Sequence, residues 1–229
     1  APILNKIGQF MSVSYIRNIL GQVKSKVDFF WMMNKGKVVL IKLPKGQLGE
    51  ENATLLGAMM LTFLQLQVMR RQSLEMEDRK DFYLYIDEFQ NVTTDSIATI
   101  LSEARKYRLN LTIVHQFIGQ LDEKTKKAVF GNVGSIATFR VGAEDAEFLE
   151  KQFAPVFNAN DLMNIDNFNA YLKILINNQT SKPFNIKIPG PTKSNPLVAE
   201  TIKELSAVKY GIPREEIEAS INKRFLNKS

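Results

Sequence analysis

Apolar segments of strand character alternate with helical segments between residues 36 and 176 of this 229-residue chain. Continuous apolar strands separated by helices are typical of a parallel sheet that is covered on both faces. The sequence therefore predicts an α/β fold. The expected strands are residues 36–44, 82–89, 109–116, 135–141 and 170–176, and the expected helices between them are residues 50–72, 96–107, 123–132 and 143–153.

This alternation ends in the stretch "IKIPGPTKSNP" (residues 186–196), which contains three prolines and one glycine. Two further helices are expected after it, over residues 196–211 and 213–225. We expect a sheet domain over residues 1–188 and an appended helical hairpin over residues 189–229. The second of these helices is apolar along one side, which suits packing on its own domain and also docking of a partner.

Composition excludes several kinds of site. The chain has no cysteine, which excludes disulfides and Cys-based zinc sites. His115 is the only histidine, so a metal site built from several histidines is excluded as well. The net charge of +6 and the pI near 9.4 suit an anionic partner, although a surface of solvated lysines has the same composition.

The most apolar stretch, residues 53–69, includes Thr62, Gln65 and Gln67 and is shorter than a clean membrane span. We expect it to form a helix that is buried on most sides, with no membrane span in this chain. The opening "APILNKIGQF" lacks the apolar core of a signal peptide and has no initiator Met. We therefore expect a cytoplasmic fragment, whose membrane association would come from a preceding region.

Two adjacent acids, Asp87 and Glu88, end the apolar run "FYLYIDEF" (residues 82–89). In phosphoryl-transfer sites a strand-end Asp anchors Mg²⁺, usually through the water shell of the ion. A neighbouring Glu can polarise or orient the water that attacks the γ-phosphate. The other interpretation is that the strand leaves the core and its next residues are solvated acids.

Polar side chains also follow the next strand, which ends in His115 and Gln116. Parallel strands present their ligand-facing residues at the same edge of a sheet, and a Gln there can bind a phosphate oxygen and the attacking water. We expect a structural role for His115. The helix between the two strands ends in Arg105, Lys106 and Arg108, which either compensate the helix dipole or neutralise charge on a phosphate.

The segment "FYLYIDEFQNVTTDSIATILSEARKYRLNLTIVHQ" (residues 82–116) resembles the Walker B to sensor segment of the conjugative coupling proteins and type IV secretion ATPases. These enzymes belong to the clan of FtsK- and HerA-type DNA translocases. The likeness covers most of residues 1–185, and its most specific parts are the acid pair, the "EARKYRL" helix end and the terminal Gln. The resemblance implies a RecA-like P-loop NTPase core that uses ATP and Mg²⁺ in a hexameric ring.

The resemblance also implies a role for each candidate residue. Asp87 would bind Mg²⁺, Glu88 would be the catalytic base, and Gln116 would sense the γ-phosphate. Arg105 would be an arginine finger that reaches into the site of the next subunit. Arg140, in "TFRVG", is a second arginine candidate for contact with the nucleotide.

The chain departs from the family pattern because it contains no G-x-x-x-x-G-K-[ST] phosphate loop. We therefore expect a partial RecA-like domain without the phosphate-loop strand, and little ATPase activity from this chain alone. Loss of that strand would leave buried strands with unpaired backbone groups. An upstream region, a second copy or the first residues of the chain could fill the gap.

The expected function is that of the C-terminal portion of an ATP-driven motor that moves DNA, or a DNA–protein substrate, in conjugation or type IV secretion. Such a motor binds DNA without reading its sequence, and we name Lys124, Lys126 and Lys127 as candidate contacts, although a solvated helix face fits them equally. Secretion-channel proteins are expected partners. Two alternatives stay open: a non-catalytic interaction module, and an ATPase whose substrate is protein.

Overall fold

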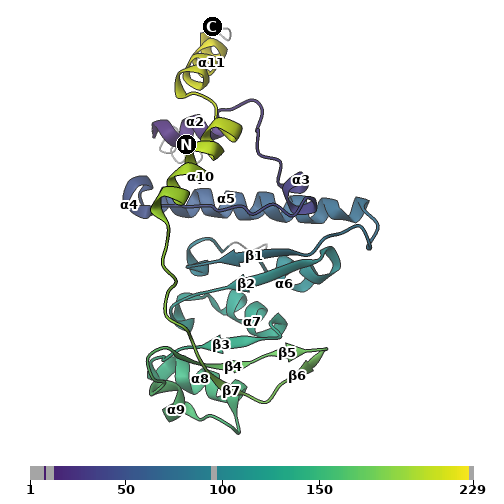
Figure 1. Ribbon diagram of the computed structural model, residues 1–229, viewed down its shortest axis with the longest axis vertical. Helices are drawn as coiled ribbons and strands as arrows, with labels where there is room; N and C mark the ends of the chain where they lie inside the picture. The colour runs from purple at the N-terminus through teal and green to yellow at the C-terminus, as the bar shows by residue number, and fades with distance from the viewer. Residues whose placement is uncertain (1–7, 9–12, 94–96, 227–229) are drawn as a thin grey trace. The chain divides into compact units, whose positions relative to one another are not determined.

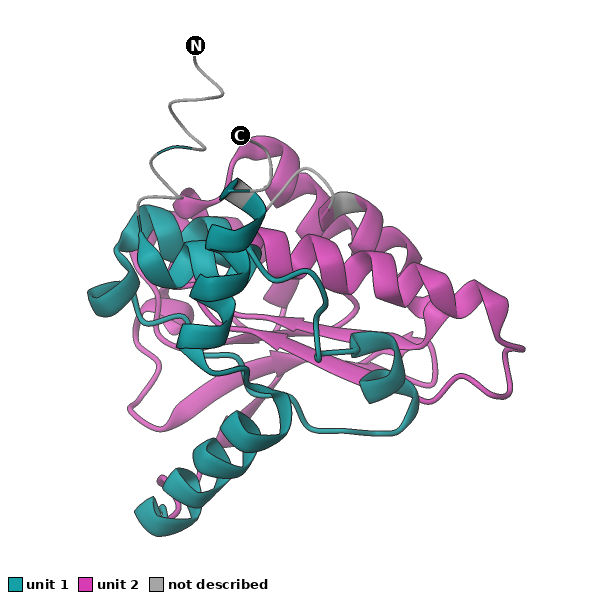
Figure 2. Ribbon diagram, turned by 90° about the horizontal axis from the view of Figure 1, so that it is seen from above, with its two compact units in different colours: residues 1–56, 193–229 teal, residues 57–192 magenta. Residues whose placement is uncertain are grey.

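The computed structural model describes residues 8, 13–93 and 97–226 (Figure 1). It divides into two compact units (Figure 2). Unit 1 spans residues 1–56 together with 193–229, and unit 2 spans residues 57–192. The fold is mixed α/β, as expected. The division into residues 1–188 and 189–229 stays a prediction.

Unit 2 contains a pair of parallel strands, β1 (Phe82–Ile86) and β2 (Leu109–Ile113). Their register runs from Phe82 opposite Leu109 to Ile86 opposite Ile113, so both strands end at the same edge. The chain between them forms η2 (Phe89–Asn91), α6 (Ile97–Glu103) and η3 (Ala104–Tyr107). The two strands expected here are confirmed, and each ends three residues earlier than predicted.

A second sheet in unit 2 has the order β3–β4–β7, and all its pairings are antiparallel. Its strands are β3 (Ile136–Thr138), β4 (Asn169–Lys173) and β7 (Phe184–Lys187), and a short antiparallel hairpin joins β5 (Leu175–Ile176) to β6 (Gln179–Thr180). The prediction of a mostly parallel sheet is therefore wrong for this region. Short apolar runs do not encode the direction of the strand beside them, and antiparallel pairing satisfies the same backbone groups.

Helices and a buried apolar cluster support the second sheet. The helices are α7 (Glu123–Asn132), α8 (Ala143–Phe153) and α9 (Ala159–Met163). The cluster consists of Ile118, Ala146, Leu149, Phe153, Leu162 and Ile165, all nearly inaccessible to solvent. The short helix η4 (Ile118–Gln120) contributes Ile118 to this cluster, so the chain that leaves β2 is anchored in the core of unit 2.

The long helix expected over residues 50–72 is confirmed as α5 (Glu50–Met69), followed by η1 (Arg70–Ser73). Within unit 2, Leu61, Leu64 and Val68 are buried, whereas Phe63 and Leu66 on the other side are exposed. The expectation that this helix is buried on most sides is therefore wrong, because one side faces solvent. By length and composition alone, Glu50–Ser73 is the one helix among the described residues that could cross a membrane, a test that core helices also pass.

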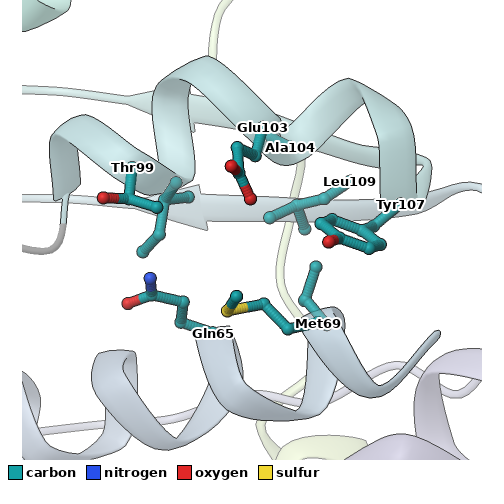
Figure 3. Close-up of a pocket in the computed structure, with 9 residues that line it drawn as sticks. Gln65, Met69, Thr99, Glu103, Ala104, Tyr107 and Leu109 are labelled. Atoms are coloured by element: carbon teal, nitrogen blue, oxygen red, sulfur yellow. The ribbon is translucent and has the colours of Figure 1, made fainter. Parts of the chain in front are cut away.

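The end of α5 packs beside α6, η3 and β2 and leaves a small hollow (Figure 3). Side chains from both helices and from β2 line it: Gln65, Val68, Met69, Thr99, Ile100, Glu103, Ala104, Tyr107 and Leu109. The lining is mostly apolar, and the Glu103 carboxylate and Tyr107 ring lie on the α6–η3 side of the hollow. It is a gap in helix packing within unit 2.

The strand expected over residues 36–44 is not formed. Among the described residues, none of this stretch pairs with a strand, and Val38 and Leu40 are 87% and 85% exposed. A β-branched apolar run becomes a strand only where a neighbour offers hydrogen-bonding partners, and unit 1 is otherwise built from helices. This expectation is therefore wrong for the described structure.

Unit 1 consists of five helices among its described residues: α2 (Ser14–Leu20), α3 (Phe29–Asn34), α4 (Lys45–Leu48), α10 (Pro196–Tyr210) and α11 (Arg214–Leu226), with α5 beginning in the same unit. Ile217 and Ile221 of α11 are buried, and α11 packs against α2. Asn18 donates from Nδ2 to Oε1 of Glu218 at 3.0 Å across this contact. Both C-terminal helices are confirmed. The apolar side of α11 packs against α2 within unit 1.

Candidate functional site

The carboxyl ends of β1 and β2 are joined by backbone hydrogen bonds that continue beyond the strands. The amide of Val114 donates to the carbonyl oxygen of Ile86 at 2.9 Å, and the amide of Phe89 donates to the carbonyl oxygen of Val114 at 2.9 Å. The Phe89 side chain is fully buried. These contacts fix the acid pair beside the polar residues that follow β2.

The structure brings Glu88 and Gln116 into direct contact. Nε2 of Gln116 donates a hydrogen bond to Oε1 of Glu88 at 2.8 Å. Glu88 has left-handed backbone angles, φ 49° and ψ 44°, which are uncommon for a residue other than glycine. This conformation ends β1 and turns the Glu88 side chain toward the end of β2, which is why the strand is shorter than its apolar pattern suggests.

Asp87 precedes this turn and is exposed. Its Oδ1 accepts a hydrogen bond from the amide of Glu88 at 3.0 Å, which holds the two acids in a defined relation. Mg²⁺ in phosphate sites keeps several waters and binds one or two carboxylates together with substrate phosphates. An exposed single carboxylate fits that donor set. Among the described residues, no group of three or more His, Asp and Glu side chains could hold a metal ion. Water molecules and phosphate oxygens would have to supply the other ligands.

Gln90 is a site residue that the sequence-based prediction missed. Its Nε2 donates to Oε2 of Glu88 at 2.5 Å, so a second amide contacts the same carboxylate. Oε1 of Gln90 and Nδ1 of His115 are buried atoms without a hydrogen-bond partner among the described residues. The only signal in the sequence is the position of Gln90 two residues after Glu88, which by itself does not indicate contact.

Arg105 lies in η3 and is exposed. Its Nη2 donates to Oδ1 of Asn178 at 3.3 Å. Arg140 follows β3 and is also exposed, and its Nη2 donates to Oδ1 of Asn167 at 2.9 Å. Neither asparagine belongs to the predicted site, and the described structure gives no direct link between these arginines and Glu88.

A buried arginine supports the segment that carries Arg105. The side chain of Arg71 is fully buried, and its Nη1 donates to the carbonyl oxygens of Tyr107 at 2.6 Å and Arg108 at 3.4 Å. Its Nη2 donates to the carbonyl oxygen of Lys80. Burial lowers the pKa of Arg71, and the nearby charge of Arg79 lowers it further. Arg71 therefore joins the end of α5 to the chain just before β1 and to the turn before β2.

Comparison with known families gives one match over the site. Residues 81–152 match the family described as "TraM recognition site of TraD and TraG". The resemblance to coupling proteins is confirmed for this segment. The matched range includes Asp87, Glu88, Arg105, Gln116 and Arg140, the five residues singled out from the sequence.

Among solved structures, the chain is similar to the plasmid coupling protein TrwB, which was solved in complex with ADP and Mg²⁺. The sequence identity is 18% and the TM-score is 0.48, and the match covers 58% of this chain. It covers 35% of the TrwB chain, so this chain spans about a third of that coupling protein. Among curated protein sequences, none matches the chain.

Proposed function

We propose that this chain is the C-terminal portion of an ATP-driven coupling protein, with a partial RecA-like core that hydrolyses ATP together with a phosphate loop outside the chain. The observation that carries this proposal is the hydrogen bond between Gln116 and Glu88 at the shared end of two parallel strands. A pair of solvated acids has no need of such a contact. A hydrolytic site needs its base and its phosphate sensor within reach of one another.

In this proposal Glu88 is the general base and Gln116 is the sensor. Glu88 takes a proton from the water that attacks the γ-phosphate, and Gln116 moves its amide from Oε1 of Glu88 to a γ-phosphate oxygen when ATP is present. Asp87 holds Mg²⁺, which when bound neutralises negative charge on the phosphates. The contact between Gln116 and Glu88 thereby links the presence of the γ-phosphate to the availability of the base.

Assembly of the parent protein into a ring is part of the proposal. Arg105 is exposed in η3, whose last residue, Tyr107, accepts a hydrogen bond from the buried Arg71, and this placement suits a cation presented to a neighbouring subunit. Arg140 is exposed too, and we retain it as a second cation for the nucleotide. A hexamer is the arrangement expected from the family resemblance.

The motor would move DNA through contacts that do not read its sequence. Lys124 and Lys127 on α7 are exposed and are the better candidates for phosphate contact. Lys126 is less suited, because its Nζ lies 4.4 Å from the centroid of the Phe148 ring and 3.9 Å from Oε1 of Glu123. We further propose a cytoplasmic location, with membrane attachment through a region outside this chain and contact with secretion-channel proteins.

One observation favours a second function, a non-catalytic interaction module. The family that matches residues 81–152 is described by a recognition site for the protein TraM. We propose that a DNA-processing partner protein binds this segment, a role that is compatible with hydrolysis and would remain if hydrolysis were absent. The substitution described next separates the two functions.

The test is Glu88→Gln in the full-length gene product, measured as Mg²⁺-dependent ATP hydrolysis. We expect turnover to fall by about 100-fold or more while nucleotide binding is retained, because the amide keeps the size of the side chain but accepts no proton. The matched control is Glu77→Gln, which changes an exposed acid before β1. Unchanged hydrolysis in Glu88→Gln would show that Glu88 is not the base, whereas a wild-type gene product that hydrolyses no ATP would leave the interaction module as the function.

A further inference from the structure

Both oxygens of one carboxylate accept hydrogen bonds from glutamine amides at the candidate site. Gln90 donates to Oε2 of Glu88 at 2.5 Å, and Gln116 donates to Oε1 at 2.8 Å. The proposed mechanism assigns a task to Gln116 only. The contact made by Gln90 therefore requires a separate explanation.

The backbone around Gln90 is held firmly. Gln90 lies in η2, where the amide of Asn91 donates to the carbonyl oxygen of Glu88 at 2.9 Å and the amide of Val92 donates to that of Phe89 at 3.1 Å. Phe89 is fully buried, and Gln90 itself is half-buried. The amide of Gln90 is thus presented to Glu88 from a short turn that is anchored in the core.

Gln116 is placed differently. Its backbone lies between Val114 and Ile118, and the amide of Ile118 donates to the buried carboxylate of Asp145 at 3.0 and 3.2 Å. Its side chain, however, is exposed. The Gln116 amide can therefore change partner by side-chain rotation into solvent, whereas the amide of Gln90 is enclosed, since its Oε1 is a buried atom.

We propose that Gln90 is a positioning residue for Glu88: it holds Oε2 throughout turnover, while Gln116 releases Oε1 to the attacking water. This inference rests on the proposed function of Glu88 as the base. A carboxylate held at one oxygen presents the lone pairs of the other in a fixed direction, which lowers the cost of reaching the reactive geometry.

An amide suits this task because of its chemistry. It donates a hydrogen bond to the ionised carboxylate, and it neither titrates near neutral pH nor competes with Glu88 for the proton of the water. A carboxyl group at the same place would repel Glu88 and disfavour its ionised form. A histidine or lysine would introduce a charge of its own.

The experiment uses three substitutions in the full-length gene product and follows kcat, KM and the pH dependence of kcat. Gln90→Met keeps the length of the side chain but removes the donor, and we expect kcat to fall by about 10- to 100-fold with KM for ATP unchanged. Gln90→Glu should move the acidic limb of the kcat profile to higher pH, because two adjacent carboxyl groups resist ionisation. Gln72→Met, at an exposed position in η1, is the matched control.

The pH profile separates positioning from general support of the fold, because a purely structural defect does not move the acidic limb. A wild-type kcat in Gln90→Met, or an unmoved limb in Gln90→Glu, would overturn the assignment of Gln90 even if Glu88→Gln is inactive. A raised KM with unchanged kcat would also overturn it, since that result would place Gln90 in nucleotide binding. Full hydrolysis in Glu88→Gln would instead reject the proposed role of Glu88 as the base, on which the assignment of Gln90 rests.

Discussion

The guanidinium of Arg71 donates to the carbonyl oxygen of Tyr107 at 2.6 Å from a fully buried position, across 36 residues of sequence. The same group also contacts the carbonyl oxygens of Arg108 and Lys80. The carbonyl dipoles around this buried charge stabilise it. Arg71 thus links the chain just before β1 to the turn before β2.

Replacement of Arg71 should therefore be costly. We expect Arg71→Met, which keeps most of the side-chain volume, to lower the free energy of unfolding by about 3 kcal/mol, because buried carbonyl oxygens lose their donors. The measurement is urea denaturation of the chain. Lys80→Ala is the control, since it removes an exposed side chain and keeps the carbonyl that Arg71 contacts. Equal midpoints for wild type and Arg71→Met would contradict this role.

Arg105 can be tested by mixing subunits. If it acts on the neighbouring site of a ring, Arg105→Ala should lower ATP turnover of the full-length gene product by about 1,000-fold. Mixed with wild type, it should inhibit more strongly than its share of the subunits, because each variant subunit disables a neighbour. Lys106→Ala, the adjacent exposed cation, is the control. A strictly linear loss of activity in the mixtures would rule out action between subunits.

DNA contact through α7 predicts a change in salt dependence. Lys124 and Lys127 are exposed there, and each phosphate contact contributes about one to the slope of log K against log salt concentration. We expect the double change Lys124→Ala and Lys127→Ala to reduce that slope by about two for DNA of random sequence, measured by fluorescence anisotropy. Lys126→Ala should have a smaller effect, because Lys126 is held near Phe148. An unchanged slope in the double variant would show that Lys124 and Lys127 of α7 do not contact DNA phosphates.

The contact between α2 and α11 predicts a pH dependence of stability. The hydrogen bond that Asn18 donates lowers the pKa of Glu218 below its usual value of 4.5, and the hydrogen bond from Arg214 lowers this pKa further, by a smaller amount. A lowered pKa in the folded state means that this contribution is fully present above pH 4.5 and is lost as the pH falls through the lower folded value.

Glu218→Gln should therefore lower the melting temperature at pH 7, and the difference from wild type should shrink below pH 4. Thermal unfolding followed by circular dichroism at the two pH values measures this difference. The control is Glu216→Gln, an exposed acid on the same helix. A gap between wild type and Glu218→Gln that is the same at both pH values would show that the charge of Glu218 is not involved.

Much of the candidate site could be predicted from the sequence because it depends on local patterns. The apolar runs that end in Asp87 and Gln116 are strands, and parallel strands joined by a helical connection bring their carboxyl ends to one edge. That reasoning alone places Glu88 near Gln116. The catalytic roles of these residues stay predictions, as do those of Arg105 and Arg140.

Other features depend on contacts between distant or differently oriented segments. Arg71 lies just after a helix, yet its side chain contacts carbonyl groups of residues 80, 107 and 108, which are distant in sequence. Residues 36–44 have a strand pattern but no strand beside them in the described structure, so the pattern is not realised. An apolar pattern indicates which side chains favour burial, but it does not indicate whether a neighbouring strand is present to pair with.

By itself, the sequence determined the longer helices α5, α7, α8, α10 and α11, the strands β1 and β2 and the meeting of Glu88 with Gln116, since these follow from local periodicity and from the geometry of parallel strands. Only the tertiary structure decided the antiparallel order β3–β4–β7 and the second amide, from Gln90, on the Glu88 carboxylate. The physical reason is that strand direction and side-chain aim depend on backbone angles set by packing. Here the left-handed turn at Glu88, fixed by the buried ring of Phe89, directs the carboxylate between the two amides.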